Sequence, residues 1–172
     1  MTQTTTMPTP EMLQEALEKF SENLGSTWKV YENNGQPYAA RRFEYLNGAQ
    51  ALLSVQPYRC FRDPKKYLTA EPLDLVKEWQ AQVSLPFSTG AELGTHDNYQ
   101  RAEEWIASVE KTLCLPFKVL ECKTPEAAES VFAGASGQAL HLLATVFDIE
   151  VHGRRQVIQS LVKTCMPARR AS

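Results

Sequence analysis

The chain has 172 residues, of which 43% are hydrophobic and 22% are charged, and its formal net charge at pH 7 is −2. A chain of this length buries roughly 70% of the surface that its unfolded form exposes, so it can build a core without a metal or a disulfide. The sequence has no run of 18 apolar residues that would predict a membrane span, and its small negative charge disfavours a general binder of polyanions.

We expect a single domain at residues 9–166, between a flexible N-terminus at 1–8 and a flexible basic tail at 167–172. The first residues lack the basic start and apolar run of a secretory signal. The cysteines lack C-x-x-C spacing, which in such a chain predicts free thiols; they are Cys60, Cys114, Cys122 and Cys165. The expected location is therefore the cytoplasm.

The N-terminal third predicts one helix followed by three strands. Thr9-Pro10-Glu11 begins the helix and Gly25 ends it. Aromatic and β-branched residues then recur in three runs separated by turns, and Asn47-Gly48 is the strongest hairpin signal. The runs are 27–32, 38–46 and 49–55. They predict an antiparallel meander, with residues 58–67 forming a loop that leaves it.

The middle of the chain predicts mainly helices. Apolar residues at helical spacing favour helices over 71–83, 97–115 and 124–134, with a loop at 84–94 and a short strand at 117–122. Asp97 and Gln100 have the spacing of a capping box. The six letters E-W-Q-A-Q-V at 78–83 are echoed by E-W-I-A-S-V at 104–109, and both are interpreted as packing chemistry.

The last third predicts a hairpin. Polar residues alternate with Phe147, Ile149 and Val151, which is the pattern of a strand. His152-Gly153 suits a turn, and residues 155–164 then form the expected second strand of the hairpin. A helix over 139–146 remains open as the alternative. The whole pattern predicts the α+β class: a single domain whose antiparallel sheet, the N-terminal three-stranded meander plus later strands, is covered by about four helices.

Residues 58–67 read Y-R-C-F-R-D-P-K-K-Y and concentrate four cations and three aromatic rings. Arginine and aromatic residues are favoured anchors in protein interfaces, whereas the alternative is a loop of solvated cations whose rings close the core. The partner-binding residues predicted here are Tyr58, Arg59, Phe61, Arg62, Lys65, Lys66 and Tyr67. This segment carries a net charge of +3, while residues 68–135 carry −6, so local fields differ in sign along the chain.

A second basic group, Arg154 and Arg155 beside His152, lies at the tip of the expected hairpin. We include both arginines in the predicted partner-binding set. Whether residues 58–67 and 152–155 share a face is left open by the sequence.

Signals for catalysis, cofactors and metals are weak. The chain lacks G-x-S-x-G, G-x-x-x-x-G-K and G-x-G-x-x-G, and no Cys or His pair has zinc-ligand spacing. We therefore expect no cofactor and no metal. Cys60 is the one residue with a signal for catalysis, because Arg59 and Arg62 could lower its pKa and folding could bring His96 or His141 beside it.

These observations favour a non-catalytic, cytoplasmic protein-binding module: an inhibitor, adaptor or chaperone of another, possibly acidic, protein, acting through residues 58–67. A first alternative is a nucleic-acid-binding accessory protein that uses 58–67 and 152–155, with phosphates on the cations and bases on the rings. A second alternative is a thiol enzyme built on Cys60 and a histidine. No membrane partner is expected, and the oligomeric state is not predicted.

Overall fold

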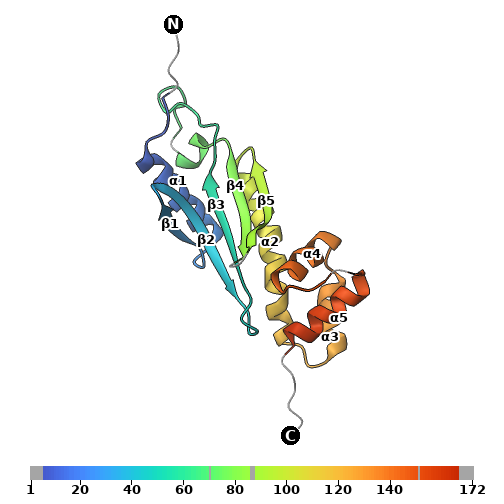
Figure 1. Ribbon diagram of the computed structural model, residues 1–172. Coiled ribbons are helices and arrows are strands. Elements are labelled where there is room, and N and C mark those ends of the chain that lie inside the picture. Colours follow the sequence, from blue (N-terminus) through green and yellow to red (C-terminus); the bar gives the residue numbers. More distant parts are fainter. Residues whose placement is uncertain (1–5, 70, 86–87, 151, 167–172) are drawn as a thin grey trace. The chain divides into compact units, whose positions relative to one another are not determined.

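The computed structural model describes residues 6–69, 71–85, 88–150 and 152–166. Their elements are drawn in Figure 1 and run, in order, α1 (Pro10–Leu24), β1 (Lys29–Asn33), β2 (Gln36–Glu44), β3 (Gln50–Pro57), the 3-10 helix η1 (Pro72–Leu75), β4 (Trp79–Leu85), β5 (Ser88–His96), α2 (Tyr99–Leu120), α3 (Pro125–Ala133), α4 (Gly137–Val146) and α5 (Arg154–Cys165). Flexible ends were expected at 1–8 and 167–172, and of these residues 1–5 and 167–172 lie outside the described ranges.

The five strands form one antiparallel sheet in the order β1-β2-β3-β4-β5. Its register pairs Tyr31 with Tyr38 across β1 and β2, and Leu53 with Val83 across β3 and β4. The predicted α+β class, a single domain with an antiparallel sheet that starts as a three-stranded meander, is confirmed.

Within this fold the chain packs as two compact units. The sheet unit comprises Met1–Arg41, Leu52–Ser84 and Glu92–Ile106, and the helical unit comprises Arg42–Ala51, Leu85–Ala91 and Ala107–Ser172.

The core of the sheet unit joins α1 to the strands. Thr9 caps α1 as predicted, because its Oγ1 accepts a hydrogen bond from the Met12 N–H at 3.2 Å. The helix lies against one face of the sheet (Figure 1), and there the ring of Phe20 contacts that of Trp79 at a centroid distance of 4.8 Å. Both side chains are fully buried.

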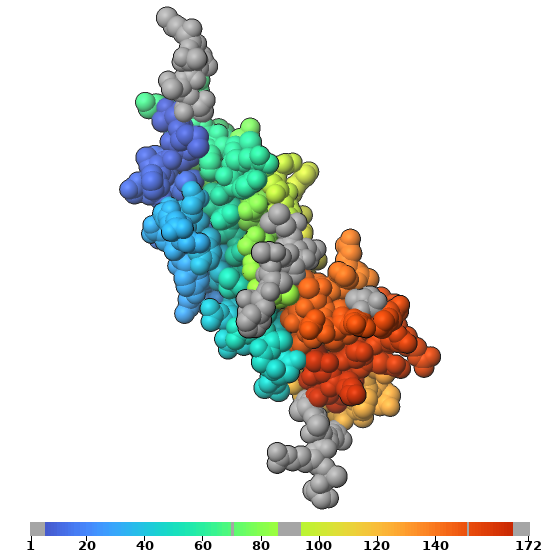
Figure 2. Space-filling model, viewed as in Figure 1, coloured from blue at the N-terminus to red at the C-terminus, as the bar shows by residue number. Residues whose placement is uncertain are grey.

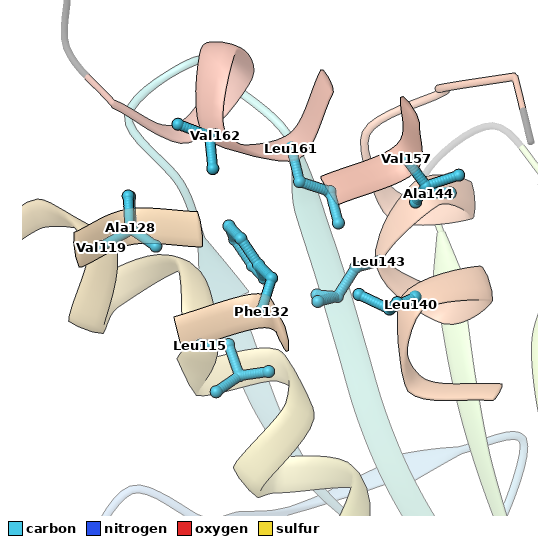
Figure 3. Packing of buried hydrophobic residues seen from close by; sticks show 10 residues of the cluster. All are labelled: Leu115, Val119, Ala128, Phe132, Leu140, Leu143, Ala144, Val157, Leu161 and Val162. Atoms are coloured by element: carbon cyan, nitrogen blue, oxygen red, sulfur yellow. The ribbon is translucent and has the colours of Figure 1, made fainter. Parts of the chain in front are cut away.

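The core of the helical unit is built from α2, α3, α4 and α5. Phe132 of α3 lies at its centre, with Leu115 of α2 beneath it and Leu143 of α4 beside it (Figure 3). The other members of this cluster are Val119, Ala128, Leu140, Ala144, Val157, Leu161 and Val162. Side chains fill the spaces between these helical ribbons in the space-filling view (Figure 2).

The prediction of a helix over 71–83 is wrong. Only Pro72–Leu75 is helical, as a single 3-10 turn, and the chain then enters β4. Trp79, Ala81 and Val83 are all fully buried, because alternate residues of a strand share one face. The loop expected at 84–94 is replaced by the end of β4 and by β5, and its residues 86–87 lie outside the described ranges.

Two further predictions are corrected in the C-terminal half. The helix α2 continues through Pro116 to Leu120, where a short strand was expected. The expected hairpin is instead the helix pair α4 and α5, so the helical alternative for 139–146 is correct. The alternating residues 147–150 form the connection after α4, where Asp148 has a left-handed φ of 55°, and Val151 lies outside the described residues.

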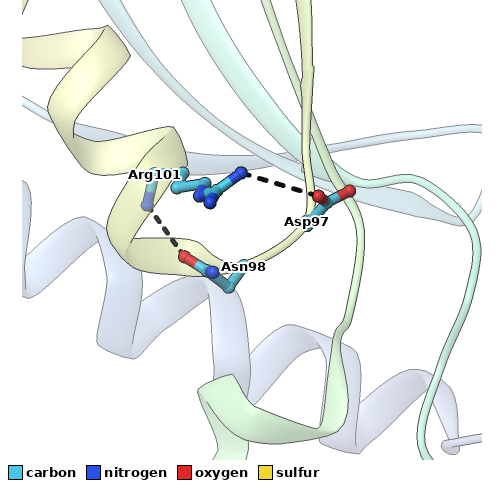
Figure 4. A network of polar contacts seen from close by, with 3 residues as sticks. All are labelled: Asp97, Asn98 and Arg101. Carbon is cyan, nitrogen blue, oxygen red and sulfur yellow. Dashed lines mark hydrogen bonds and ion pairs between the residues drawn. The ribbon is translucent and has the colours of Figure 1, made fainter.

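The cap of α2 is shifted by one residue from the predicted position. Asn98 Oδ1 accepts a hydrogen bond from the Arg101 N–H at 2.9 Å, and Asp97 forms an ion pair with the Arg101 guanidinium at 3.7 Å (Figure 4).

Within the described ranges, none of the helices combines the length and apolar character that a bilayer-spanning segment requires.

Candidate partner-binding surface

The predicted loop at 58–67 begins as an extension of the β3–β4 ladder. Pro57 pairs with Trp79, the Tyr58 N–H donates to the Glu78 carbonyl at 3.0 Å, and Phe61 forms an isolated bridge with Val76. Three residues therefore lie between the two pairs on one strand, 58–60, and two on the other, 77–78. One extra residue in one strand is a β-bulge, which redirects side chains and often occurs at functional edges.

Cys60 is the bulged residue with unusual backbone geometry. Its φ is 63°, in the left-handed region, which costs a residue other than glycine roughly 1–2 kcal/mol. Hydrogen bonds on both sides hold the bulge: the Lys77 N–H donates to the Cys60 carbonyl at 2.9 Å, and the Arg62 N–H donates to the Leu75 carbonyl at 2.8 Å. The backbone of 58–62 is thus fixed by the neighbouring strand.

The segment 63–67 closes as a turn. Asp63 Oδ1 accepts from the Lys65 N–H at 2.9 Å, and the Asp63 carbonyl accepts from the N–H groups of Lys66 and Tyr67 at 3.1 and 2.8 Å. An aspartate side chain that bonds the backbone two residues further on is the usual chemistry of such turns.

Two arginine–tyrosine stacks flank the turn. The Arg59 guanidinium lies 4.6 Å from the centroid of the Tyr58 ring, and the Arg62 guanidinium lies 4.5 Å from that of Tyr67. Arg62 also donates a side-chain hydrogen bond to the Asp74 carbonyl. Each exposed cation–π contact contributes about 0.5–1 kcal/mol, which favours the stacked arrangement of these rings and guanidinium groups.

The outer surface of this segment combines apolar and cationic groups. Tyr58 and Tyr67 are each 38% exposed, and Leu68 is 92% exposed. Lys65 and Lys66 are exposed, and among the residues that the structure describes neither ammonium group forms an ion pair. Sequence reasoning missed Leu68, although an apolar residue directly after K-K-Y and outside any periodic pattern was a usable signal.

Carboxylates next to the loop offset part of its charge. Glu78 forms an ion pair with Arg59 at 3.5 Å, and Glu71 and Asp74 lie on the returning segment. Residues 58–78 contain five cations and four anions, so the folded loop is much less basic than its ten-residue sequence suggests.

Arg154 and Arg155 do not lie at a hairpin tip, because they form the first turn of α5. The Arg154 guanidinium donates to the carbonyls of Ala133 and Ala135, at 2.7 and 2.8 Å, where α3 ends. A cation at this position satisfies orphan carbonyls and complements the negative end of the helix dipole. The two arginines belong to the helical unit and the 58–67 loop to the sheet unit.

The environment of Cys60 opposes an activated thiol. A hydrogen bond to Glu78 raises the pKa of Cys60 above its ordinary value of 9.0, with smaller contributions from burial and from the Glu78 charge, and these outweigh the lowering by Lys77 and Arg59. The expectation that neighbouring arginines make this thiol acidic is therefore wrong. None of the four cysteines forms a disulfide, and no group of three His, Cys, Asp or Glu side chains in the described ranges could hold a metal ion.

His96, the last residue of β5, packs against α2. Its ring contacts that of Trp105 at 5.6 Å, and its Nε2 is buried without a hydrogen-bond partner among the described residues. A Cβ at position 94 would lie 2.7 Å from His96 Nε2, so a residue larger than glycine there would displace the imidazole. His141 lies on the exposed side of α4, in the helical unit.

The fold and this surface define an α+β protein with an ordered loop of basic and aromatic residues at 58–68. Comparison of the chain with protein-family models, curated proteins and solved structures gave no match.

Proposed function

We propose that this chain is a non-catalytic protein-binding module that captures an acidic partner protein through the basic-aromatic loop, defined as residues 58–68. An inhibitor, adaptor or chaperone acting in the cytoplasm has this chemistry. The observation that supports the proposal best is the combination of a backbone fixed at the bulge with exposed tyrosines, Leu68 and two exposed lysines that form no ion pair with any residue the structure describes.

Preorganisation is the energetic reason for choosing this surface. A loop that is ordered before binding loses little conformational entropy in the complex. Tyrosine and arginine are typical hot-spot residues, and here Tyr58 and Tyr67 already carry stacked guanidinium groups. Lys65 and Lys66 would mainly steer an acidic partner and increase its association rate.

The proposal is tested by capture of a partner followed by affinity measurement. Wild-type protein, K65E/K66E and L68S are immobilised and exposed to lysate, and the proteins retained are identified by mass spectrometry. The double variant K19E/K29E is the matched control, because it reverses two exposed lysines elsewhere in the sheet unit. All five substituted positions are exposed, so thermal unfolding should change little.

The expected result is a protein that wild type and K19E/K29E retain and that both loop variants lose. The affinity of the purified partner should fall by roughly tenfold or more for L68S and K65E/K66E if these groups lie in the interface. Equal retention by all variants, with folding intact, would contradict the proposal.

A further inference from the structure

A second groove lies in the helical unit, between α2 and the α3–α4 connection. Its volume is about 470 Å³, within the range of natural ligand pockets. One wall is a face of α2 at helical spacing, consisting of Ser108, Lys111, Thr112, Leu115 and Lys118. The opposite wall comes from the end of α3 and the start of α4, including Val131, Ala135 and Ala139.

The floor of the groove is the outer edge of the helical unit's core. Leu115 belongs to the buried cluster around Phe132, and Val131 and Ala135 are half-buried side chains packed against that cluster. In Figure 3 the Leu115 side chain lies directly below the Phe132 ring. An apolar side chain that entered the groove would therefore extend an existing hydrophobic core, which is favourable in proportion to the apolar area it buries.

The rim of the groove is positive. Lys111 and Lys118 are exposed, and among the described residues neither ammonium group forms an ion pair. No acidic side chain lines the groove among the residues described, although the chain as a whole carries a net charge of −2.

The backbone of the far wall reinforces this positive potential. The carbonyls of Ala133 and Ala135, at the negative end of α3, are occupied by the Arg154 guanidinium. The N-terminus of α4, capped by Ser136, contributes the positive end of its dipole beside them. Arg154 thus acts as a positioning residue, because it fixes the turn and neutralises the carbonyls that would otherwise repel an anion.

The spacing of the rim selects the shape of the ligand. Lys111 and Lys118 are seven residues apart on one helix, which is two turns or about 10.5 Å. A second helix laid along α2 with carboxylates at positions i and i+7 would match this interval, and its apolar residues between them would face Leu115.

We infer that the α2/α3–α4 groove is a docking site for an acidic amphipathic helix of a partner protein, held by Lys111 and Lys118 at its rim and by the apolar floor around Leu115. This site lies in a different unit from the basic-aromatic loop and stands independently of the function proposed for that loop.

The test uses the full chain and a defined peptide. The probe is a fluorescent, alanine-based helix of about 18 residues, long enough to be helical in water, with glutamates at i and i+7 and leucines between them. Binding is followed by fluorescence anisotropy, and the contact surface is mapped by amide chemical shifts. We expect saturable binding, with shifts concentrated at 108–118 and 131–139.

Variants separate charge, shape and folding. The charge-neutralising K111Q/K118Q and the groove-filling S108W should each weaken the peptide by roughly tenfold, while the loop variant K65E/K66E leaves it unchanged. Circular dichroism establishes that each variant is folded. A peptide with lysines in place of glutamates should not bind.

Three outcomes would overturn the inference. They are absence of saturable binding by wild type, undiminished binding by folded K111Q/K118Q and S108W, and displacement of the peptide by millimolar inorganic phosphate with the same shifts. The last result would assign the groove to a small anion instead of a helix.

Discussion

The thiol of Cys60 is exposed, yet its surroundings keep it protonated. Its hydrogen bond to Glu78 favours the neutral form, and the same carboxylate pairs with Arg59. The positive charges visible in the sequence are thus offset by an anion 18 residues further along the chain, which the β3–β4 ladder brings beside them. Local sequence could not show this partner.

We predict that E78Q accelerates alkylation of Cys60 by iodoacetamide at pH 8. Replacing the carboxylate by a neutral amide removes the negative charge and weakens the hydrogen bond that favours the protonated thiol, so the pKa of Cys60 falls and the reactive thiolate becomes more abundant. The rate at each cysteine is measured by mass spectrometry. E71Q is the matched control, and an unchanged rate in E78Q would contradict this account.

His96 predicts a pH dependence of stability. Burial lowers the pKa of His96 below its ordinary value of 6.5, and the charge of Asp97 only partly opposes this effect. The folded state therefore binds a proton less readily than the unfolded state. The contribution of His96 to the free energy of unfolding is fully present above pH 6.5. It is lost as the pH falls from 6.5 towards the folded-state pKa and changes no further below that pKa.

The expected measurement is the urea midpoint between pH 8 and pH 5. Wild type should lose more stability over this interval than H96Q, because the variant has no imidazole to protonate. H141Q should follow wild type, since His141 is exposed on α4. Parallel curves for wild type and H96Q would show that His96 is not the titrating group.

Among the elements, the α3–α4 turn depends on one long side chain from α5. Arg154 donates to two carbonyls of that turn, whereas its neighbour Arg155 lines a separate groove between α3 and α5. We predict that R154A lowers the free energy of unfolding by about 1 kcal/mol. R155A should change it by less than about 0.5 kcal/mol, and equal effects in urea titrations would refute the distinction.

The β2–β3 hairpin tip is tied to α2 within the helical unit. The Tyr45 hydroxyl donates to the Leu113 carbonyl at 2.7 Å, and its ring packs on Phe117 and Phe147 at 5.1 and 4.9 Å. Pro116 lacks an N–H, so this stretch of α2 is one donor short. The carbonyl that loses its intrahelical donor is that of Thr112, four residues before the proline, and the Tyr45 hydroxyl bonds the adjacent carbonyl of Leu113.

Y45F should consequently lower the free energy of unfolding by about 1 kcal/mol, since the ring packing remains and one buried hydrogen bond is lost. Y99F, in the first turn of α2, serves as a control in the same helix. Chemical denaturation measures both. A neutral Y45F would mean that the bond to Leu113 is replaced by another donor.

At the scale of the whole molecule, the distribution of charge favours the proposed protein partner over a nucleic acid. The chain is net negative, and anions of the returning segment nearly balance the cations of residues 58–78. Neutralised phosphates dominate nucleic-acid affinity and make it steeply dependent on salt. A binder of this kind would need more unpaired cations than the loop presents.

We therefore predict elution of the full chain from heparin at low salt, below physiological ionic strength. K65E/K66E should shift this elution only slightly, and K19E/K29E should shift it equally, because neither pair forms a phosphate-binding surface. Retention to high salt that K65E/K66E abolishes would instead support the nucleic-acid alternative.

Elements that depend on neighbouring residues were predictable. Thr9-Pro10-Glu11 and Thr124-Pro125-Glu126 each begin a helix with the threonine side chain accepting from an N–H three residues on. Asn47-Gly48 forms the predicted turn, with Gly48 at a φ of 85°. Caps and turns are bonded within four residues, so their signals survive without knowledge of the fold.

The echoed motif shows the opposite case. E-W-Q-A-Q-V at 78–83 is strand, with Trp79, Ala81 and Val83 buried at a period of two, whereas E-W-I-A-S-V at 104–109 is helix, with Ala107 exposed and Ile106 buried. Similar sequences therefore show the burial period of the element that each of them forms, which is two in the strand and 3.6 in the helix. The same reason underlies the corrected hairpin at 147–164, whose short alternation lies in a helix connection.

The candidate surface divides along the same line. Its aromatic and cationic residues, and the turn at Asp63, could be predicted from the sequence. The bulge at Cys60, the carboxylate of Glu78, the exposure of Leu68 and the capping role of Arg154 were not, because each depends on a partner 15 or more residues away or on packing around it. Short-range hydrogen bonds are encoded in adjacent residues, whereas the surroundings of a side chain exist only after distant segments have packed together.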